Sequence, residues 1–104
     1  MKSINVNELK RLQDSNEDFV LIDVREVHEN ENASMNGVLI PMGEIAERFN
    51  EIPKDKKVVV HCRSGARSAN VISWLEQTHG YQNLYNLEGG IMAWAATYDP
   101  ALRV

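Results

Sequence analysis

The sequence predicts an α/β domain with a mainly parallel β-sheet and helices on both faces. Two observations carry this prediction. Short apolar runs rich in valine and isoleucine alternate along the chain with segments whose apolar residues recur at helical spacing. The connections between them are short, as in βαβ units. With 104 residues, the chain has the length of one domain, spanning residues 1–104.

The N-terminal half alternates strands and helices up to the centre of the chain. The expected elements are a short strand with Ile4 and Val6, a helix to about Gln13, a buried strand at Phe19–Val24, a solvated loop at Glu26–Asn36, a short strand at Val38–Ile40 and a helix at Met42–Phe49. Asn5 or Asn7 can cap the first helix, and Pro41 stops the short third strand.

The C-terminal half follows the same pattern. The expected elements are a surface connection at Ile52–Lys56, a buried strand at Val58–Val60, a polar turn, a helix to about Thr78, a short strand at Asn83–Leu87 and a last helix from Ile91 to about Thr97. Gly80 supplies the stop of the longer helix. We expect Trp74 and Trp94 to be core residues.

Composition excludes several classes of function. The net charge of -4 argues against a nucleic-acid or anionic-membrane partner. No apolar run approaches membrane-spanning length, so we expect a cytoplasmic protein. The single cysteine rules out an internal disulfide and a cysteine-rich zinc site. His28 and His79 show no metal-ligand spacing, and we expect neither a metal nor a cofactor.

The candidate site is the polar turn that joins the central strand to the following helix. Its residues are Cys62, Arg63, Ser64, Gly65, Ala66, Arg67 and Ser68. Free amides of the turn and of the helix N-terminus can converge on the cysteine sulfur, and two arginines lie near it in sequence. We therefore expect a lowered pKa for Cys62 and a reactive thiolate rather than an inert buried thiol.

The order of motifs resembles that of the rhodanese-like sulfurtransferases. The resemblance spans nearly the whole chain and rests on Leu21–Glu26, Ile40-Pro41, Cys62–Ser68, and Leu87–Gly90 followed by Trp94. It implies a three-layer α/β/α fold around a five-stranded parallel sheet. It also implies that Cys62 takes a sulfane sulfur from thiosulfate or another donor and passes it to cyanide or a thiol, including a protein thiol. The amides from Arg63 to Ser68 would then cradle the persulfide.

One segment departs from the family pattern. Where the family usually carries Gly-His-Ile-x-Gly-Ala, this chain has Asn32-Ala33-Ser34-Met35-Asn36-Gly37, without the histidine. The departure concerns the local loop conformation and a possible partner surface rather than the cysteine chemistry.

The side chains of the turn have alternative roles. Arg67 either places a charge near the persulfide or forms an ion pair that fixes the loop. Arg63 is expected at the pocket mouth, where it favours anionic donors. For Ser64 and Ser68, loop capping is favoured over a bond to sulfur. Gly65 is expected to adopt a conformation that a Cβ would obstruct.

Residues outside the turn are assigned to support. Asp23 and Arg25 follow a buried strand, and we expect them to brace the active-site loop through ion pairing. His61 directly precedes Cys62, but adjacent strand residues point to opposite faces, so a general-base role is not expected.

Three rival functions remain open. A cysteine phosphatase or arsenate reductase of the same fold is disfavoured, because the related phosphatases have five residues between cysteine and arginine and this chain has four. A non-catalytic binding module is disfavoured by the retained cysteine and full loop. A persulfide relay that works only with a protein partner shares the chemistry of the main interpretation.

Overall fold

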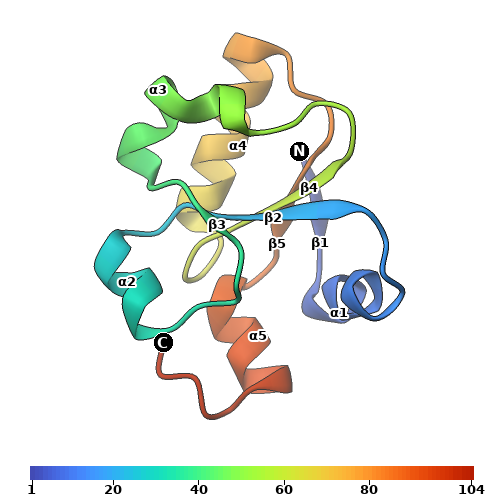
Figure 1. Ribbon diagram of the computed structural model, residues 1–104, viewed down its shortest axis with the longest axis vertical. Helices are drawn as coiled ribbons and strands as arrows, with labels where there is room; N and C mark the ends of the chain where they lie inside the picture. Colours follow the sequence, from blue (N-terminus) through green and yellow to red (C-terminus); the bar gives the residue numbers. More distant parts are fainter.

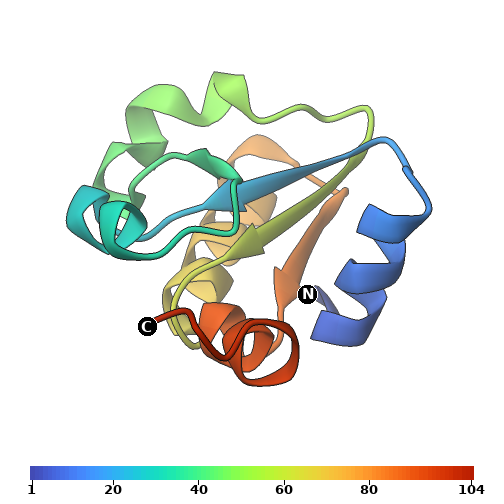
Figure 2. The same cartoon turned by 60° about the horizontal axis from the view of Figure 1, so that its bottom comes forward.

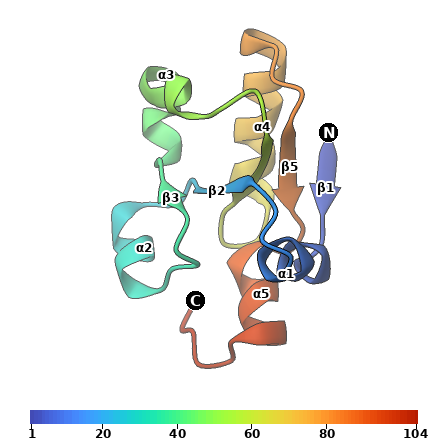
Figure 3. The same cartoon turned by 45° about the vertical axis from the view of Figure 1, so that its right-hand side comes forward.

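The computed structural model describes residues 1–104, which form one five-stranded sheet flanked by helices. The strands are β1 (Lys2–Ile4), β2 (Phe19–Asp23), β3 (Val38–Leu39), β4 (Lys57–His61) and β5 (Leu84–Leu87). Their order is β1-β5-β4-β2-β3, and every neighbouring pair is parallel. Figure 3 shows β1 at one edge of this sheet and β3 at the other.

Helices cover both faces of the sheet, which gives the three layers that the sequence predicts. They are α1 (Val6–Asp14), α2 (Val27–Asn32), η1 (Met42–Glu44), α3 (Ile45–Arg48), η2 (Phe49–Glu51), α4 (Ala66–His79) and α5 (Gly90–Tyr98). Figure 1 shows α3 and α4 on one side of the sheet and α1 and α5 on the other.

The central strand β4 divides the core in two. Val58 and Val60 pack into the cluster beneath α3 and α4, whereas Val59 packs into the cluster beneath α1 and α5. All three are fully buried. Burial of each valine contributes about 1.5–3 kcal/mol, so β4 is fixed from both sides and the loop that follows it starts from a rigid position.

The helix boundaries follow from their caps. Asn5 is the N-cap of α1, with its side chain accepting from the Glu8 amide at 2.9 Å, as the sequence predicts. Val6, expected in the first strand, is instead the first residue of this helix. Gly80 ends α4 with φ at 67°.

The segment Glu26–Asn36, expected as a solvated loop, contains the helix α2, so that expectation is wrong. Glu26 and Glu29 form a capping box at the N-terminus of α2. Arg25 then binds its C-terminal end through the Ala33 carbonyl oxygen at 2.7 Å. Satisfying both ends allows a polar, six-residue helix to form.

Three smaller expectations are also wrong. The helix expected at Met42–Phe49 is broken into η1, α3 and η2. Ile52, expected on a surface connection, is buried, and the Tyr81 hydroxyl donates to its carbonyl oxygen at 2.8 Å. Trp74 is 36% exposed rather than a core residue, while Trp94 is partly buried against the core.

Candidate active site

The loop between β4 and α4 wraps its backbone around the Cys62 sulfur. The Gly65 amide lies 3.1 Å from Sγ and the Ser68 amide 3.5 Å from it, and the Ser68 hydroxyl oxygen is 3.4 Å away. Ser68 is the third residue of α4. Its amide is one that the side chain of an N-cap residue usually accepts from, and here the Cys62 sulfur takes that place. Cys62 is 1% exposed and lies at the floor of the loop.

These contacts change the acidity of the thiol. Burial raises the pKa of Cys62, but the hydrogen-bonding groups of Ser68, Gly65 and Ser64 around the sulfur outweigh it, so the pKa is lowered overall. The direction agrees with the expectation from the sequence. Because the thiolate is the nucleophilic form of cysteine, the loop favours the reactive species.

Two glycines allow the loop to close this tightly. Gly65 has φ at 108°, a conformation that side chains rarely adopt, as the sequence suggests. Gly90, at the start of α5, lies against the backbone of the loop, where a Cβ would overlap the carbonyl oxygens of Cys62 and Arg63. The close approach lets the Ile91 amide donate to the Cys62 carbonyl oxygen at 3.0 Å, so α5 anchors the loop.

Arg67 is held by an ion pair with α2. Its Nη1 and Nη2 lie 2.7 and 2.9 Å from the two carboxylate oxygens of Glu29. The Arg67 hydrogen bonds lower the pKa of Glu29 to about 2. Of the two roles considered for Arg67, the structure shows the ion pair that fixes the loop. The positive charge of Arg67 also interacts with Cys62.

Asp23 and Arg25 form a buried pair at the end of β2, which runs beside β4. Arg25 Nη2 lies 2.8 Å from Asp23 Oδ2, and both side chains are at most 3% exposed. Burial raises the pKa of Asp23, but the hydrogen bonds from Arg25, the nearby His61 and a hydrogen bond from Asn30 together outweigh it, so the pKa is lowered. Arg25 also holds the Ala33 carbonyl oxygen, so the pair fixes α2 and, through Glu29, the position of Arg67.

The other loop residues face outward. Arg63, Ser64 and Ala66 are exposed. Arg63 donates to the Val104 carbonyl oxygen at 3.4 Å, and Figure 2 shows the chain end beside the loop. A small pocket of about 100 Å³ lies between Arg63 and α2. Arg63 is therefore an exposed residue on the rim of this pocket.

His61 is fully buried and makes no hydrogen bond with the Cys62 sulfur. Its Nδ1 lies 3.4 Å from the Cys62 carbonyl oxygen, and burial lowers its pKa. A buried imidazole without a path to the sulfur does not act as its base, which agrees with the interpretation of the sequence.

The segment that departs from the family pattern is held by buried side chains and by a contact with the C-terminal residues. Ala33 and Met35 are buried, and Asn36 takes a positive φ of 64°. Asn32 Nδ2 donates to the Arg103 carbonyl oxygen at 2.6 Å. These contacts hold the segment at the end of α2 without the histidine that the family usually carries there.

Sequence reasoning missed two residues of the site. Glu29 holds Arg67, and its signal was the glutamate pair Glu26 and Glu29 at capping-box spacing. Asn86, on β5, contacts both Gly65 and Ser68. No local sequence pattern predicts that Asn86 contacts the loop, because this contact depends on the pairing of β5 with β4.

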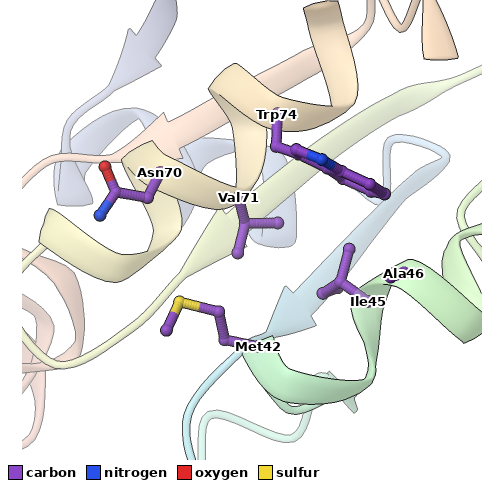
Figure 4. A pocket seen from close by; sticks show the side chains of 6 residues that line it. All are labelled: Met42, Ile45, Ala46, Asn70, Val71 and Trp74. Carbon is purple, nitrogen blue, oxygen red and sulfur yellow. The ribbon is translucent and has the colours of Figure 1, made fainter. Parts of the chain in front are cut away.

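An apolar groove of about 180 Å³ lies between η1, α3 and α4. Figure 4 shows the Trp74 ring and the Met42 side chain turned into it from opposite walls. This open groove explains why Trp74 is 36% exposed rather than buried in the core. No cluster of side chains suited to a metal ion is present, and none of the helices has the length and apolar character needed to cross a bilayer.

A parallel α/β sheet that presents one cysteine to the amides of a strand-to-helix loop is typical of enzymes that use a cysteine nucleophile. Residues 5–97 match the family model of the rhodanese-like domain. The chain belongs to the rhodanese-like family, and its relatives support a role in sulfur transfer.

Individual relatives and a solved structure support the same family. The chain is 46% identical to a sulfurtransferase of Allochromatium vinosum, covering 83% of this chain and 79% of that protein. It is 41% identical to the putative sulfurtransferase YtwF of Bacillus subtilis, covering 96% of each. The crystal structure of a rhodanese-related protein from Thermoplasma volcanium superposes with a TM-score of 0.83 at 32% identity, covering 94% of each chain.

Proposed function

We propose that this protein is a sulfurtransferase that carries a sulfane sulfur as a persulfide on Cys62, working as a single domain. In the first half-reaction the Cys62 thiolate attacks the outer sulfur of thiosulfate or of another persulfide or polysulfide donor. A bond forms between Sγ and that sulfur. The bond from the outer sulfur to the rest of the donor breaks, and its electron pair leaves with sulfite or the donor remainder.

In the second half-reaction an acceptor nucleophile attacks the terminal sulfur of the persulfide. The acceptor is a small or protein thiolate, or cyanide in an assay. The bond between the terminal sulfur and Sγ breaks, its electron pair returns to Sγ, and the Cys62 thiolate is restored. No net oxidation occurs, so the cycle needs neither metal nor cofactor. We propose a cytoplasmic location, where cellular thiol reductants keep a single cysteine in its reduced form.

The observation that carries this proposal is the set of amides around the sulfur. Those of Gly65 and Ser68 already reach Sγ. The amides of Ala66 and Arg67 have no acceptor within the protein and lie at the N-terminus of α4. They are available to a terminal sulfur that carries negative charge, and preorganised donors of this kind stabilise charge at little entropic cost.

The surrounding residues have supporting roles. Arg63 attracts anionic donors at the mouth, Ser64 and Gly65 shape the turn, and Arg67 is fixed by Glu29 beside the cradle. Asp23 and Arg25 brace the loop through α2.

Transfer assays with a panel of donors and acceptors test the proposal. The wild type and Cys62→Ser are compared with thiosulfate, polysulfide and a low-molecular-weight persulfide as donors, and with cyanide and a thiol as acceptors. We expect transfer from at least one donor that depends on Cys62. Equal transfer by Cys62→Ser would refute the assignment of the nucleophile. Weak turnover with every small acceptor, but fast transfer to a protein thiol, would identify a relay.

A further inference from the structure

Asn86 lies behind the loop and contacts two of its residues at once. Its Nδ2 is 3.1 Å from the Gly65 carbonyl oxygen, and its Oδ1 is 2.6 Å from the Ser68 hydroxyl oxygen. Asn86 comes from β5, whose register with β4 pairs Val60 with Asn86, next to the start of the loop. Neighbouring strands therefore fix the amide against the loop.

The orientation of the Asn86 amide follows from the partners. A carbonyl oxygen only accepts hydrogen bonds, so the nitrogen of the amide must face Gly65. The amide oxygen then faces Ser68, and because it too only accepts, the Ser68 hydroxyl must donate to it. The reverse orientation would set two oxygens against each other at Gly65.

This arrangement decides where the single proton of Ser68 goes. The hydroxyl oxygen has three neighbours that can accept: Asn86 Oδ1 at 2.6 Å, the Gly65 carbonyl oxygen at 3.2 Å and Cys62 Sγ at 3.4 Å. One proton serves one acceptor, and the shortest contact is to Asn86. The Ser68 oxygen then turns a lone pair toward the sulfur, which suits a thiol and opposes a thiolate.

The same amide sets the direction of a donor in the cradle. Asn86 and the Ala69 amide, at 3.2 Å, both hold the Gly65 carbonyl oxygen. In a planar trans peptide the N–H of the next residue points opposite to the carbonyl. Holding this carbonyl toward Asn86 therefore turns the Ala66 amide away from β5.

We propose that Asn86 is a positioning residue that draws the Ser68 hydroxyl proton away from the Cys62 sulfur and leaves the sulfur to the backbone amides of the loop. The functional meaning of this proposal rests on the proposed role of Cys62. The test of the proposal does not, because alkylation measures the ionisation of the Cys62 thiol whether or not Cys62 carries sulfur in its function.

The test is the pH profile of Cys62 alkylation by iodoacetamide. In Asn86→Ala the freed hydroxyl can donate to the thiolate, so the midpoint of the profile should fall by about one pH unit. If Asn86 merely supported the loop, its loss would loosen the amides and move the midpoint upward. A midpoint that is unchanged or higher in the folded variant overturns the proposal.

Ser68→Ala gives a second arm that remains informative if Asn86→Ala fails to fold. If the Ser68 hydroxyl donates to Asn86, it donates no hydrogen bond to the thiolate. Removing the hydroxyl should therefore leave the midpoint of the profile unchanged or lower it. A higher midpoint in Ser68→Ala would contradict the proposal. In the double variant, Asn86→Ala should no longer lower the midpoint. The other charged or titratable groups around the sulfur, Arg63, Arg67, Glu29 and His61, are the same in all of these proteins.

Discussion

Arg67 and Glu29 lie 38 residues apart in the sequence and form a two-bonded ion pair that joins α4 to α2. The side chains are 32% and 20% exposed. The pair is the direct link between the cysteine loop and the segment that the sequence suggested was a solvated loop.

This ion pair predicts a pH-dependent contribution to stability. Hydrogen bonds from Arg67 lower the pKa of Glu29 from 4.5 to about 2. A lowered pKa in the folded state means stability that is present above pH 4.5 and lost as the pH falls toward 2. Glu29→Gln should therefore lower the free energy of unfolding by about 1 kcal/mol at neutral pH, and the difference should shrink toward pH 2.

Urea unfolding at several pH values measures this difference. Asp14→Asn, which removes the exposed pair with Lys10, is the matched control and should change stability by less than about 0.5 kcal/mol. A Glu29→Gln effect that does not depend on pH would show that the ion pair is not its source.

The buried pair of Asp23 and Arg25 predicts a much larger effect. Arg25→Ala leaves the Asp23 carboxylate buried without its main partner and frees the Ala33 carbonyl oxygen. We expect a loss of about 3–5 kcal/mol in the free energy of unfolding, measured by chemical denaturation. Lys10→Ala serves as the exposed control, and similar losses in the two variants would argue against the bracing role.

The approach of α5 to the loop predicts a strict requirement for glycine at position 90. Gly90→Ala places a Cβ against the carbonyl oxygens of Cys62 and Arg63, in a backbone with φ at 58°. We expect a loss of stability above about 2 kcal/mol and slower alkylation of Cys62. Gly43→Ala is the matched control, because nothing lies within 4 Å of its Cβ and its φ is not positive. Equal tolerance of both substitutions would contradict the anchoring of the loop by α5.

The exposed position of Arg63 predicts an effect on donor binding. Arg63→Ala should raise KM for thiosulfate about fivefold and change kcat less, because it removes a charge that attracts the anion before reaction. Arg63→Lys keeps the charge and should retain most of the affinity. Steady-state kinetics separates the effect on KM from the effect on kcat. An unchanged KM in Arg63→Ala would mean that Arg63 faces solvent and does not contribute to donor binding.

Local patterns predict most of this fold. The valines of β4 and the apolar run of β2 mark buried strands because residues buried on both faces leave no polar positions. Asn5 and Gly80 mark helix ends because their side-chain chemistry and conformational freedom act on neighbouring residues.

The errors occur where structure depends on distant partners. The helix α2 buries none of its own residues and is stabilised by Arg25 from outside, so it shows no apolar periodicity. Trp74 has helical spacing, but the short helices opposite it leave an open groove rather than a closed core. The contacts of Asn86 with Gly65 and Ser68 exist only because β5 pairs with β4.

The most direct test of the central claim is the intact mass of the protein before and after incubation with thiosulfate, followed by cyanide. The account predicts that the wild type gains one sulfur atom, that cyanide removes it, and that Cys62→Ser gains none. If thiosulfate fails, polysulfide under the same conditions distinguishes a different donor from an inert cysteine. A folded wild-type protein whose Cys62 can be alkylated but takes sulfur from neither donor would contradict the account.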